Sequence, residues 1–213
     1  MARIARVVVP GYPHHVTQRG NRRQTTFFNQ KDYSFYRGLM ARWCRHYQAE
    51  VWAYCLMPNH VHLVVVPSTE EALSRVVGET HRRYALKVNQ REGWRGHLWQ
   101  ERFASFVMEQ AYLFAAVRYV ELNPVRAGLV ERPEDYPWSS ACAHLKNRDD
   151  ALVTVKPMLE MVDSWEKFLQ VDEDESYNPI RKHEKTGRPL GSASFIEKME
   201  SLTGRALRPQ RKR

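Results

Sequence analysis

The spacing of apolar side chains changes along the first 125 residues, and these changes predict the order of the secondary-structure elements. Apolar residues recur at helical spacing where a helix is expected, whereas runs of β-branched residues bounded by turn residues indicate strands. On this basis we expect strands over residues 15–19, 50–57, 60–66 and 102–108, and helices over residues 30–47, 68–92 and 110–122.

The order strand, helix, strand, strand, helix, strand, followed by a further helix, is typical of a split βαβ unit. The sequence therefore predicts an α+β protein with a ferredoxin-like split βαβ antiparallel sheet and helices on one face. We expect this domain to occupy residues 1–145, and residues 146–213 to form a C-terminal helical and basic extension. Within the extension we expect an acidic linker at residues 172–175, short helices at 164–169 and 192–202, and a mobile basic end at 208–213.

Composition narrows the class of partner. The formal net charge is +9, and the chain has neither a long apolar run nor a basic amphipathic anchor, which argues against a membrane partner. Such a charge favours a polyanion, in practice nucleic acid, although a basic protein without this partner has the same composition. Three cysteines without a Cys-x-x-Cys pair indicate neither a disulfide framework nor a cysteine zinc site. The first residues lack the apolar core of a signal peptide, so we expect a cytoplasmic protein.

Two histidines lie in the predicted strand over residues 60–66, directly after a tight turn. Side chains alternate along a strand, so His60 and His62 point to the same face, about 6.5–7 Å apart. Two imidazoles on one face can hold a metal ion from one side if other residues supply the remaining ligands. The alternative is that both are hydrogen-bonded residues of the core or its rim. His14 and His15 lie at the start of another predicted strand, where we expect turn hydrogen bonds.

The third predicted helix carries the other half of a candidate site. Tyr112, Tyr119 and Asn123 share one stripe of this helix, apart from the apolar stripe that we assign to the core. Tyr119 and Asn123 are spaced i and i+4, so their side chains are neighbours about 6 Å apart. Tyr112 is a rival of Tyr119, about 10 Å away along the helix axis. Asn123, directly before Pro124, is alternatively a helix-terminating residue.

These residue types together suit phosphoryl transfer. A divalent metal held by His60, His62 and Asn123 would polarise the non-bridging oxygens of a phosphodiester. The Tyr119 oxygen would attack phosphorus, form a phosphotyrosine and release a 3′-hydroxyl, and the energy of the linkage would be kept for joining a second strand. A free phenol has a pKa of about 10, so a base must help to remove its proton, and the sequence does not identify that base.

The same residues carry a resemblance to a known family. The segment MPNHVHLVV at residues 57–65 resembles the paired-histidine motif of HUH single-strand endonucleases, and YVELNPVRAG at residues 119–128 resembles the nucleophile helix of their single-tyrosine transposases. More narrowly, the chain is similar to the REP-associated tyrosine transposases, which are linked to repetitive extragenic palindromes in bacteria. Short segments at residues 14–22, 99–103, 136–141 and 186–191 support this resemblance.

The resemblance implies a metal-dependent endonuclease and strand transferase that acts in DNA transposition and recombination. Its substrate would be single-stranded DNA folded into a palindromic, REP-like hairpin, cleaved through a covalent 5′-phosphotyrosine at Tyr119. The resemblance also implies Mg or Mn as the divalent metal, and a bacterial protein of the cytoplasm that associates with the nucleoid. A monomer and a homodimer both remain open.

Six arginines are candidate DNA contacts, three around the loop after the first predicted strand and three further along the chain. They are Arg19, Arg22 and Arg23 in the first group and Arg82, Arg83 and Arg102 in the second. Guanidinium groups bind phosphates and, in the first group, could also read bases at the foot of a hairpin. Each is alternatively part of a solvated basic surface.

Three other functions remain open from the sequence. A protein that binds DNA hairpins without cutting them would need the charge but not Tyr119 beside metal ligands. A replication or plasmid-transfer initiator uses similar chemistry, but more often in a larger chain with paired tyrosines, and the helix over residues 110–122 has no such pair. A metal-dependent hydrolase of small phosphoesters would not explain the net charge.

Overall fold

Four strands form one antiparallel sheet at the centre of the protein. The computed structural model describes residues 4–170 and 177–208. The order across the sheet is β2-β3-β1-β4, and each neighbouring pair is antiparallel. The strands are β1 (His14–Arg19), β2 (Ala49–Met57), β3 (His60–Pro67) and β4 (Ala104–Val107).

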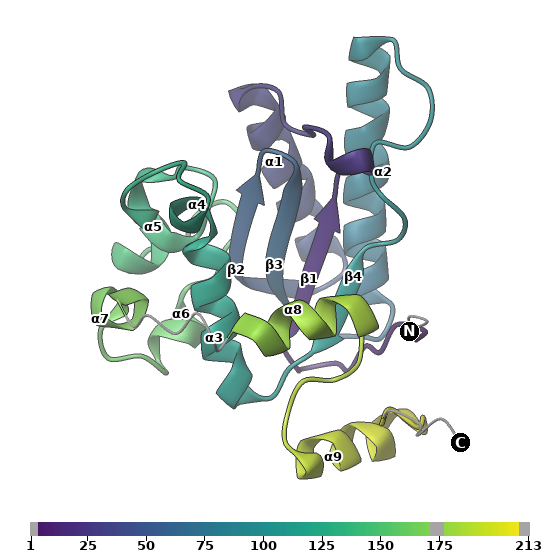
Figure 1. Cartoon of the computed structure of the whole chain (residues 1–213), viewed down its shortest axis with the longest axis vertical. Helices are drawn as coiled ribbons and strands as arrows, with labels where there is room; N and C mark the ends of the chain where they lie inside the picture. The colour runs from purple at the N-terminus through teal and green to yellow at the C-terminus, as the bar shows by residue number, and fades with distance from the viewer. Residues whose placement is uncertain (1–3, 171–176, 209–213) are drawn as a thin grey trace.

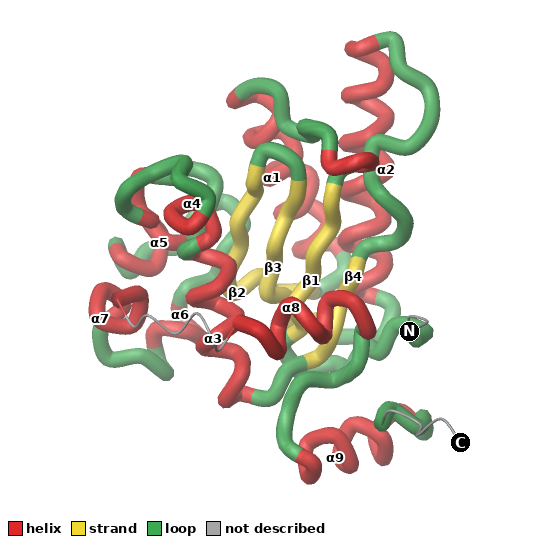
Figure 2. The backbone as a smooth tube through the Cα atoms, in the orientation of Figure 1, coloured by secondary structure: helices red, strands yellow, loops and turns green. Residues whose placement is uncertain are grey.

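Helices cover both faces of this sheet. α1 (Gln30–His46) links β1 to β2, α2 (Ala72–Glu92) links β3 to β4, and the two pack together on one face (Figure 1). The predicted α+β, ferredoxin-like order of elements is therefore confirmed. The expectation of helices on only one face is wrong, because the chain after β4 returns over the other face. The opposite face carries α3 (Gln110–Glu121) and, from a distant part of the chain, α8 (Tyr177–Thr186), which crosses in front of the strands (Figure 2).

Local side chains explain where the two core helices begin. The side chain of Asn29 accepts a hydrogen bond from the backbone amide of Asp32 at 3.2 Å, so α1 begins at the predicted cap. α2 begins at Ala72 rather than at Ser68, because Thr69 Oγ1 accepts the hydrogen bond of the Ala72 amide at 3.2 Å.

The chain beyond α3 folds back against the sheet as a series of short elements. Isolated bridges from Val51 to Val153 and from Met108 to Leu190 attach it to β2 and to the end of β4. The remaining elements are η1 (Asn21–Arg23), α4 (Asn123–Arg126), η2 (Pro133–Asp135), α5 (Ala141–Leu145), α6 (Lys156–Leu159), α7 (Trp165–Gln170) and α9 (Ala193–Thr203).

The sequence predicted the four strands and the helices α1, α2, α3, α7 and α9, but neither α8 nor the short elements η1, α4, η2 and α6. The predicted acidic linker at residues 172–175 and nearly all of the predicted basic end lie outside the described residues, and the domain boundary at residue 145 stays a prediction. Within residues 4–170 and 177–208, no helix is both long and apolar enough to cross a membrane.

A buried carboxyl group on α3 ties the later segments to the core. Oε1 of Glu121 accepts hydrogen bonds from Ser140 Oγ at 2.5 Å and from His144 Nδ1 at 2.7 Å. Its Oε2 accepts a hydrogen bond from Nε1 of Trp165 at 2.9 Å, and Glu121 is 0% exposed. Because donors from two separate later segments meet at this carboxyl group, Glu121 fixes their position against α3.

Candidate active site

β3 places the two predicted histidines on the face of the sheet that α3 and α8 cover. The ring centroids of His60 and His62 are 4.9 Å apart, and His62 is buried. His60 Nδ1 lies 2.6 Å from Oδ1 of Asn59 in the β2–β3 turn, a hydrogen bond that orients the ring. The His60 imidazole is therefore held against this turn, and His62 lies beside it on the same strand.

A third histidine, His15 of β1, joins this pair through the register of the strands. Thr17 pairs with His62 across β1 and β3, so His15 lies diagonally beside His62 on the same face. The two rings stack with centroids 5.3 Å apart, and Nε2 of His15 is 3.2 Å from Nδ1 of His62. The expected turn role is wrong for His15. It is confirmed for His14, whose Nδ1 donates to the carbonyl oxygen of Tyr12 at 2.8 Å.

Glu184 of α8 brings a carboxylate to the two stacked histidines. Its Oε1 is 3.7 Å from Nδ1 of His15 and 3.7 Å from Nδ1 of His62. Ligand atoms of the three residues all lie within 4.8 Å of one another. Nδ1 of His15 and Oε1 of Glu184 are buried and have no hydrogen-bond partner among the described residues. Two unpaired buried polar atoms next to each other are a feature that a bound cation would satisfy.

Burial controls the protonation of this cluster. Desolvation lowers the pKa of His15 to about 3, and desolvation followed by the charge of Arg19 lowers the pKa of His60 to about 4. Burial, reinforced by the neighbouring histidines and arginines, lowers the pKa of His62 well below its ordinary value. Burial also raises the pKa of Glu184 to about 7. Uncharged imidazoles keep a lone pair for a metal ion, so the histidines suit ligation at neutral pH.

Tyr119 of α3 faces the histidines. Its ring centroid is 5.4 Å from that of His62, and the residue is 9% exposed. Cζ of Arg126 lies 4.4 Å from the ring centroid, and Arg181 of α8 makes a side-chain hydrogen bond with Tyr119. Burial, and secondly the charge of Glu184, raise the pKa of the phenol, while both arginines oppose this shift. The two guanidinium groups are thus placed to stabilise a phenolate.

Asn123 and Tyr112 take no part in the interactions described above. α3 ends two residues before Asn123, which begins α4. In the part of the chain that the structure describes, the Asn123 side chain makes no hydrogen bond with Tyr119 or with either predicted histidine. Its role as a ligand stays a prediction. Tyr112 lines a separate cavity of about 530 Å³ with residues of α8.

Three of the predicted arginines lie at the rim of the histidine site. Arg19 is exposed at the end of β1 and pairs with His60 in the register of the sheet. Arg22 and Arg23 are exposed in the next turn, with φ of 54° and 61°. The carbonyl oxygen of Arg23 accepts a hydrogen bond from Nδ2 of Asn59 at 3.1 Å, which holds this basic turn against the β2–β3 turn.

The other three predicted arginines lie away from that rim. Arg82 and Arg83 on α2 both pair with Glu79, at 2.8 and 3.2 Å, on the helix layer behind the sheet (Figure 1). Arg82 and Arg102 also line a cavity of about 500 Å³ together with Trp99. These arginines form a second basic region, separated from the histidines by the sheet.

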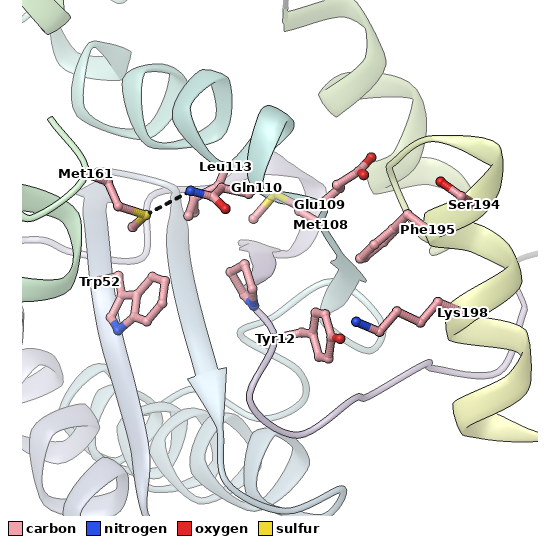
Figure 3. A pocket seen from close by; sticks show the side chains of 11 residues that line it. Tyr12, Trp52, Met108, Glu109, Gln110, Leu113, Met161, Ser194, Phe195 and Lys198 are labelled. Atoms are coloured by element: carbon pink, nitrogen blue, oxygen red, sulfur yellow. Dashed lines mark hydrogen bonds between the residues drawn. The ribbon is translucent and has the colours of Figure 1, made fainter.

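Another cavity, of about 520 Å³, opens near the N-terminal end of α3 (Figure 3). Tyr12 from the segment before β1, Trp52 from β2, and Phe195 and Lys198 from α9 point toward it. None of the predicted site residues lines this cavity, so it is separate from the histidine site.

The family of the chain follows from a match to its sequence. A family model described as "Transposase IS200 like" matches residues 8–123. This segment is more than half of the chain and contains the histidine strand and Tyr119, so the chain belongs to the IS200-like transposase family. α8 lies beyond the matched segment.

Two individual proteins extend this result. A Haemophilus influenzae (strain ATCC 51907 / DSM 11121 / KW20 / Rd) protein named "Putative REP-associated tyrosine transposase" is 25% identical over 116 residues, which are 49% of this chain and 66% of that protein. A solved structure described as a REP-associated tyrosine transposase bound to a REP hairpin matches with a TM-score of 0.58 and 21% identity, over 72% of this chain and 92% of that chain. At this identity the structural likeness shows the fold. The resemblance to REP-associated tyrosine transposases is confirmed.

Two members of the cluster, His15 and Glu184, were not predicted from the sequence as site residues. His15 could have been found from the alternation of β1 only if the pairing of β1 with β3 had been known. Glu184 lies in a polar segment whose buried residues Tyr177 and Ile180 are the only apolar signal of α8. Two apolar residues at helical spacing are too few to predict a helix.

Proposed function

We propose that the protein is a metal-dependent single-stranded DNA endonuclease and strand transferase that recognises palindromic, REP-like hairpins. The observation that supports this proposal most directly is the position of Tyr119, whose ring faces His62 at 5.4 Å on the covered side of the sheet. A nucleophile beside uncharged imidazoles and two guanidinium groups suits attack on a phosphodiester.

In the proposed reaction, the Tyr119 hydroxyl oxygen attacks phosphorus as its proton leaves. The bond from phosphorus to the 3′-oxygen breaks, and that oxygen departs as a 3′-hydroxyl once protonated. The product is a covalent 5′-phosphotyrosine that keeps a phosphodiester-type linkage, so a second 3′-hydroxyl can attack it and join a new strand. Arg126 and Arg181 lie next to the phenol and would stabilise its negative charge during the attack.

The residues present fit the divalent metal that this chemistry requires. His60 and His62 are the predicted pair, and the unpaired buried atoms of His15 and Glu184 lie beside them. A bound Mg or Mn ion would withdraw charge from the non-bridging phosphate oxygens. Imidazole ligands also accept other transition ions, so the choice of metal is left to experiment.

A hairpin-binding protein that does not cut DNA is the second candidate, and one observation favours it. Tyr119 is only 9% exposed, and α8 lies over the sheet face that carries the histidines. While α8 stays in place, only a small part of the Tyr119 side chain is open to a phosphate. We propose the cutting function first, because pure binding gives no reason to place Tyr119 and two arginines beside the histidines.

A nicking assay separates these two candidates. Purified protein is mixed with a labelled hairpin that carries single-stranded flanks, with Mn²⁺ or with EDTA, and analysed on a denaturing gel. We expect a cut strand and a protein-linked band with Mn²⁺ only, both absent from His60→Ala. Binding without any adduct, across several REP-like hairpins and several metals, would contradict the cutting function and leave the hairpin-binding protein.

The proposed partner is hairpin DNA in the bacterial cytoplasm, at the nucleoid, and the protein acts as a monomer or a homodimer. The exposed arginines at the rim are the part of the surface closest to the histidines. We therefore assign the hairpin foot to Arg19, Arg22 and Arg23, and treat Arg82, Arg83 and Arg102 as a second, weaker candidate contact.

Replacing arginines by alanine and measuring hairpin affinity tests this assignment. The double change Arg22→Ala and Arg23→Ala is expected to weaken hairpin binding about tenfold and to reduce the salt slope of log K by about 1.5–2, because two phosphate contacts are lost. The double change Arg82→Ala and Arg83→Ala, on the far side of the sheet, is the matched comparison and should change both values less. Affinity is measured by fluorescence anisotropy at several salt concentrations. The opposite ranking of the two variants would move the interface to α2.

A further inference from the structure

The helix α8 lies beside the candidate active site, although it is outside the segment that the family model matches. It lies across the sheet face that holds the histidines (Figure 1). Buried Tyr177 sits 5.3 Å from the ring of Tyr119, and the ring of His183 sits 5.8 Å from that of Phe106 on β4. His183 Nδ1 also donates to the carbonyl oxygen of Arg188 at 2.9 Å, which holds the end of the helix. α8 is therefore packed on both α3 and the sheet.

This packing brings one carboxylate between two imidazoles. Oε1 of Glu184 is 3.7 Å from Nδ1 of His15 and 3.7 Å from Nδ1 of His62, and Glu184 is 20% exposed. These separations are longer than hydrogen bonds. Ligand atoms that share one ion lie about 3.0–3.5 Å apart, because each sits about 2.1 Å from the metal. The two separations from Glu184 are thus slightly longer than those in a filled site.

The two unpaired atoms need a physical explanation. Burying a polar atom without a partner is unfavourable by about 1–3 kcal/mol, so native structures contain few of them. Here Nδ1 of His15 and Oε1 of Glu184 are both unpaired, buried and neighbours. A cation bound between them would satisfy both, whereas packing alone would have favoured apolar side chains at these positions.

We propose that Glu184 is a metal ligand, and that it completes with His15 and His62 the divalent-cation site beside Tyr119. This inference rests on the proposed function in one respect, namely that the site binds a divalent metal. It adds His15 and Glu184 to the histidine pair predicted from the sequence, and it gives Glu184 the role of further ligand that was predicted for Asn123. The C-terminal segment then belongs to the active centre and is more than a cover over it.

Two imidazoles and one carboxylate form a ligand set that suits Mn²⁺, so Mn²⁺ alone is the probe. Metal-free full-length protein is titrated with Mn²⁺ in the absence of DNA, and free Mn²⁺ is followed by electron paramagnetic resonance. We expect Glu184→Gln to weaken Mn²⁺ binding at least about tenfold, since a ligand is lost. The matched control is Glu160→Gln, which changes an exposed glutamate paired with Lys156 at 3.7 Å and should bind as the wild type does.

A second variant separates ligation from general electrostatic attraction. Glu184→Asp keeps the negative charge but shortens the side chain by one methylene. If Glu184 is a metal ligand, this change lowers the Mn²⁺ affinity clearly. If Glu184 only attracts the cation by its charge, the Mn²⁺ affinity does not change. Circular dichroism checks that each variant is folded. Wild-type Mn²⁺ affinity in both Glu184 variants overturns the proposal. A gain in Mn²⁺ affinity or in hairpin cleavage on removing the carboxylate also overturns it, because Glu184 would then be a blocking residue.

The outcome also separates this inference from the proposed function. Mn²⁺ binding that depends on Glu184, in a protein that never cuts hairpin DNA, supports the metal site and contradicts the cutting function. Cleavage by the wild type together with unchanged Mn²⁺ binding in Glu184→Gln supports the cutting function and overturns Glu184 as a ligand. Absence of Mn²⁺ binding by the wild type overturns the inference.

Discussion

Tyr119→Phe is expected to remove the covalent protein–DNA adduct and to lower hairpin cleavage by at least about a thousandfold, because the attacking oxygen is lost. The change keeps the aromatic ring, so the contacts with His62 at 5.4 Å and with Tyr177 at 5.3 Å remain. Only the hydroxyl and its hydrogen bond with Arg181 disappear. The loss therefore concerns the chemistry rather than the packing.

Tyr112→Phe is the matched control for this experiment. Tyr112 lies on the same helix, two turns earlier, and lines a different cavity. Both variants are compared with the wild type in Mn²⁺ on a denaturing gel, and hairpin affinity is measured in parallel. Retention of the adduct in Tyr119→Phe, or its loss in Tyr112→Phe alone, would assign the nucleophile to another residue.

Glu121→Ala is expected to destabilise the fold by about 3–5 kcal/mol, since it removes the acceptor of three buried donors. Ser140, His144 and Trp165 all donate to this carboxyl group at 2.5–2.9 Å. After truncation, these three donors are left in a buried cavity without their acceptor. Glu121→Gln keeps the shape but turns one acceptor oxygen into a donor, so a smaller loss is expected.

Urea denaturation followed by circular dichroism measures this effect. Glu131→Ala is the control, because Glu131 is exposed on the surface, where a substitution changes stability by about 0.5 kcal/mol at most. A shift of the midpoint without a change in slope would show that only stability has altered. A stability within about 1 kcal/mol of the wild type would mean that water or a rearrangement replaces the lost acceptor.

Short-range rules were sufficient for the parts of the protein that depend on one segment at a time. The β2–β3 hairpin, the cap of α1 at Asn29 and the order of the split βαβ core follow from turn residues, capping and apolar spacing. The pairing of His60 with His62 on one face follows from strand alternation, whatever the rest of the chain does. Identifying the third helix with the nucleophile helix of a family also needed only a local motif.

Other features depended on how separate segments meet. His15 reaches His62 because Thr17, and not a neighbouring residue, pairs with His62 between β1 and β3. The register depends on both strands, so neither strand predicts it alone. The six arginines look alike in the sequence, yet three line the rim of the histidine site and three do not. Glu184 lies 122 positions after His62 in the chain. No local sequence pattern predicts which face of the sheet α8 will cover.

The sequence by itself thus determined the fold class and the family, and it predicted the candidate site residues that lie on a single strand or helix, because periodicity and motifs are local. Only the tertiary structure decided that His15 and Glu184 join them, and that Asn123 makes no hydrogen bond with the two predicted histidines among the described residues. The physical reason is that strand register and helix docking are set by the packing of the whole core, in which each side chain's position depends on segments far away in the chain.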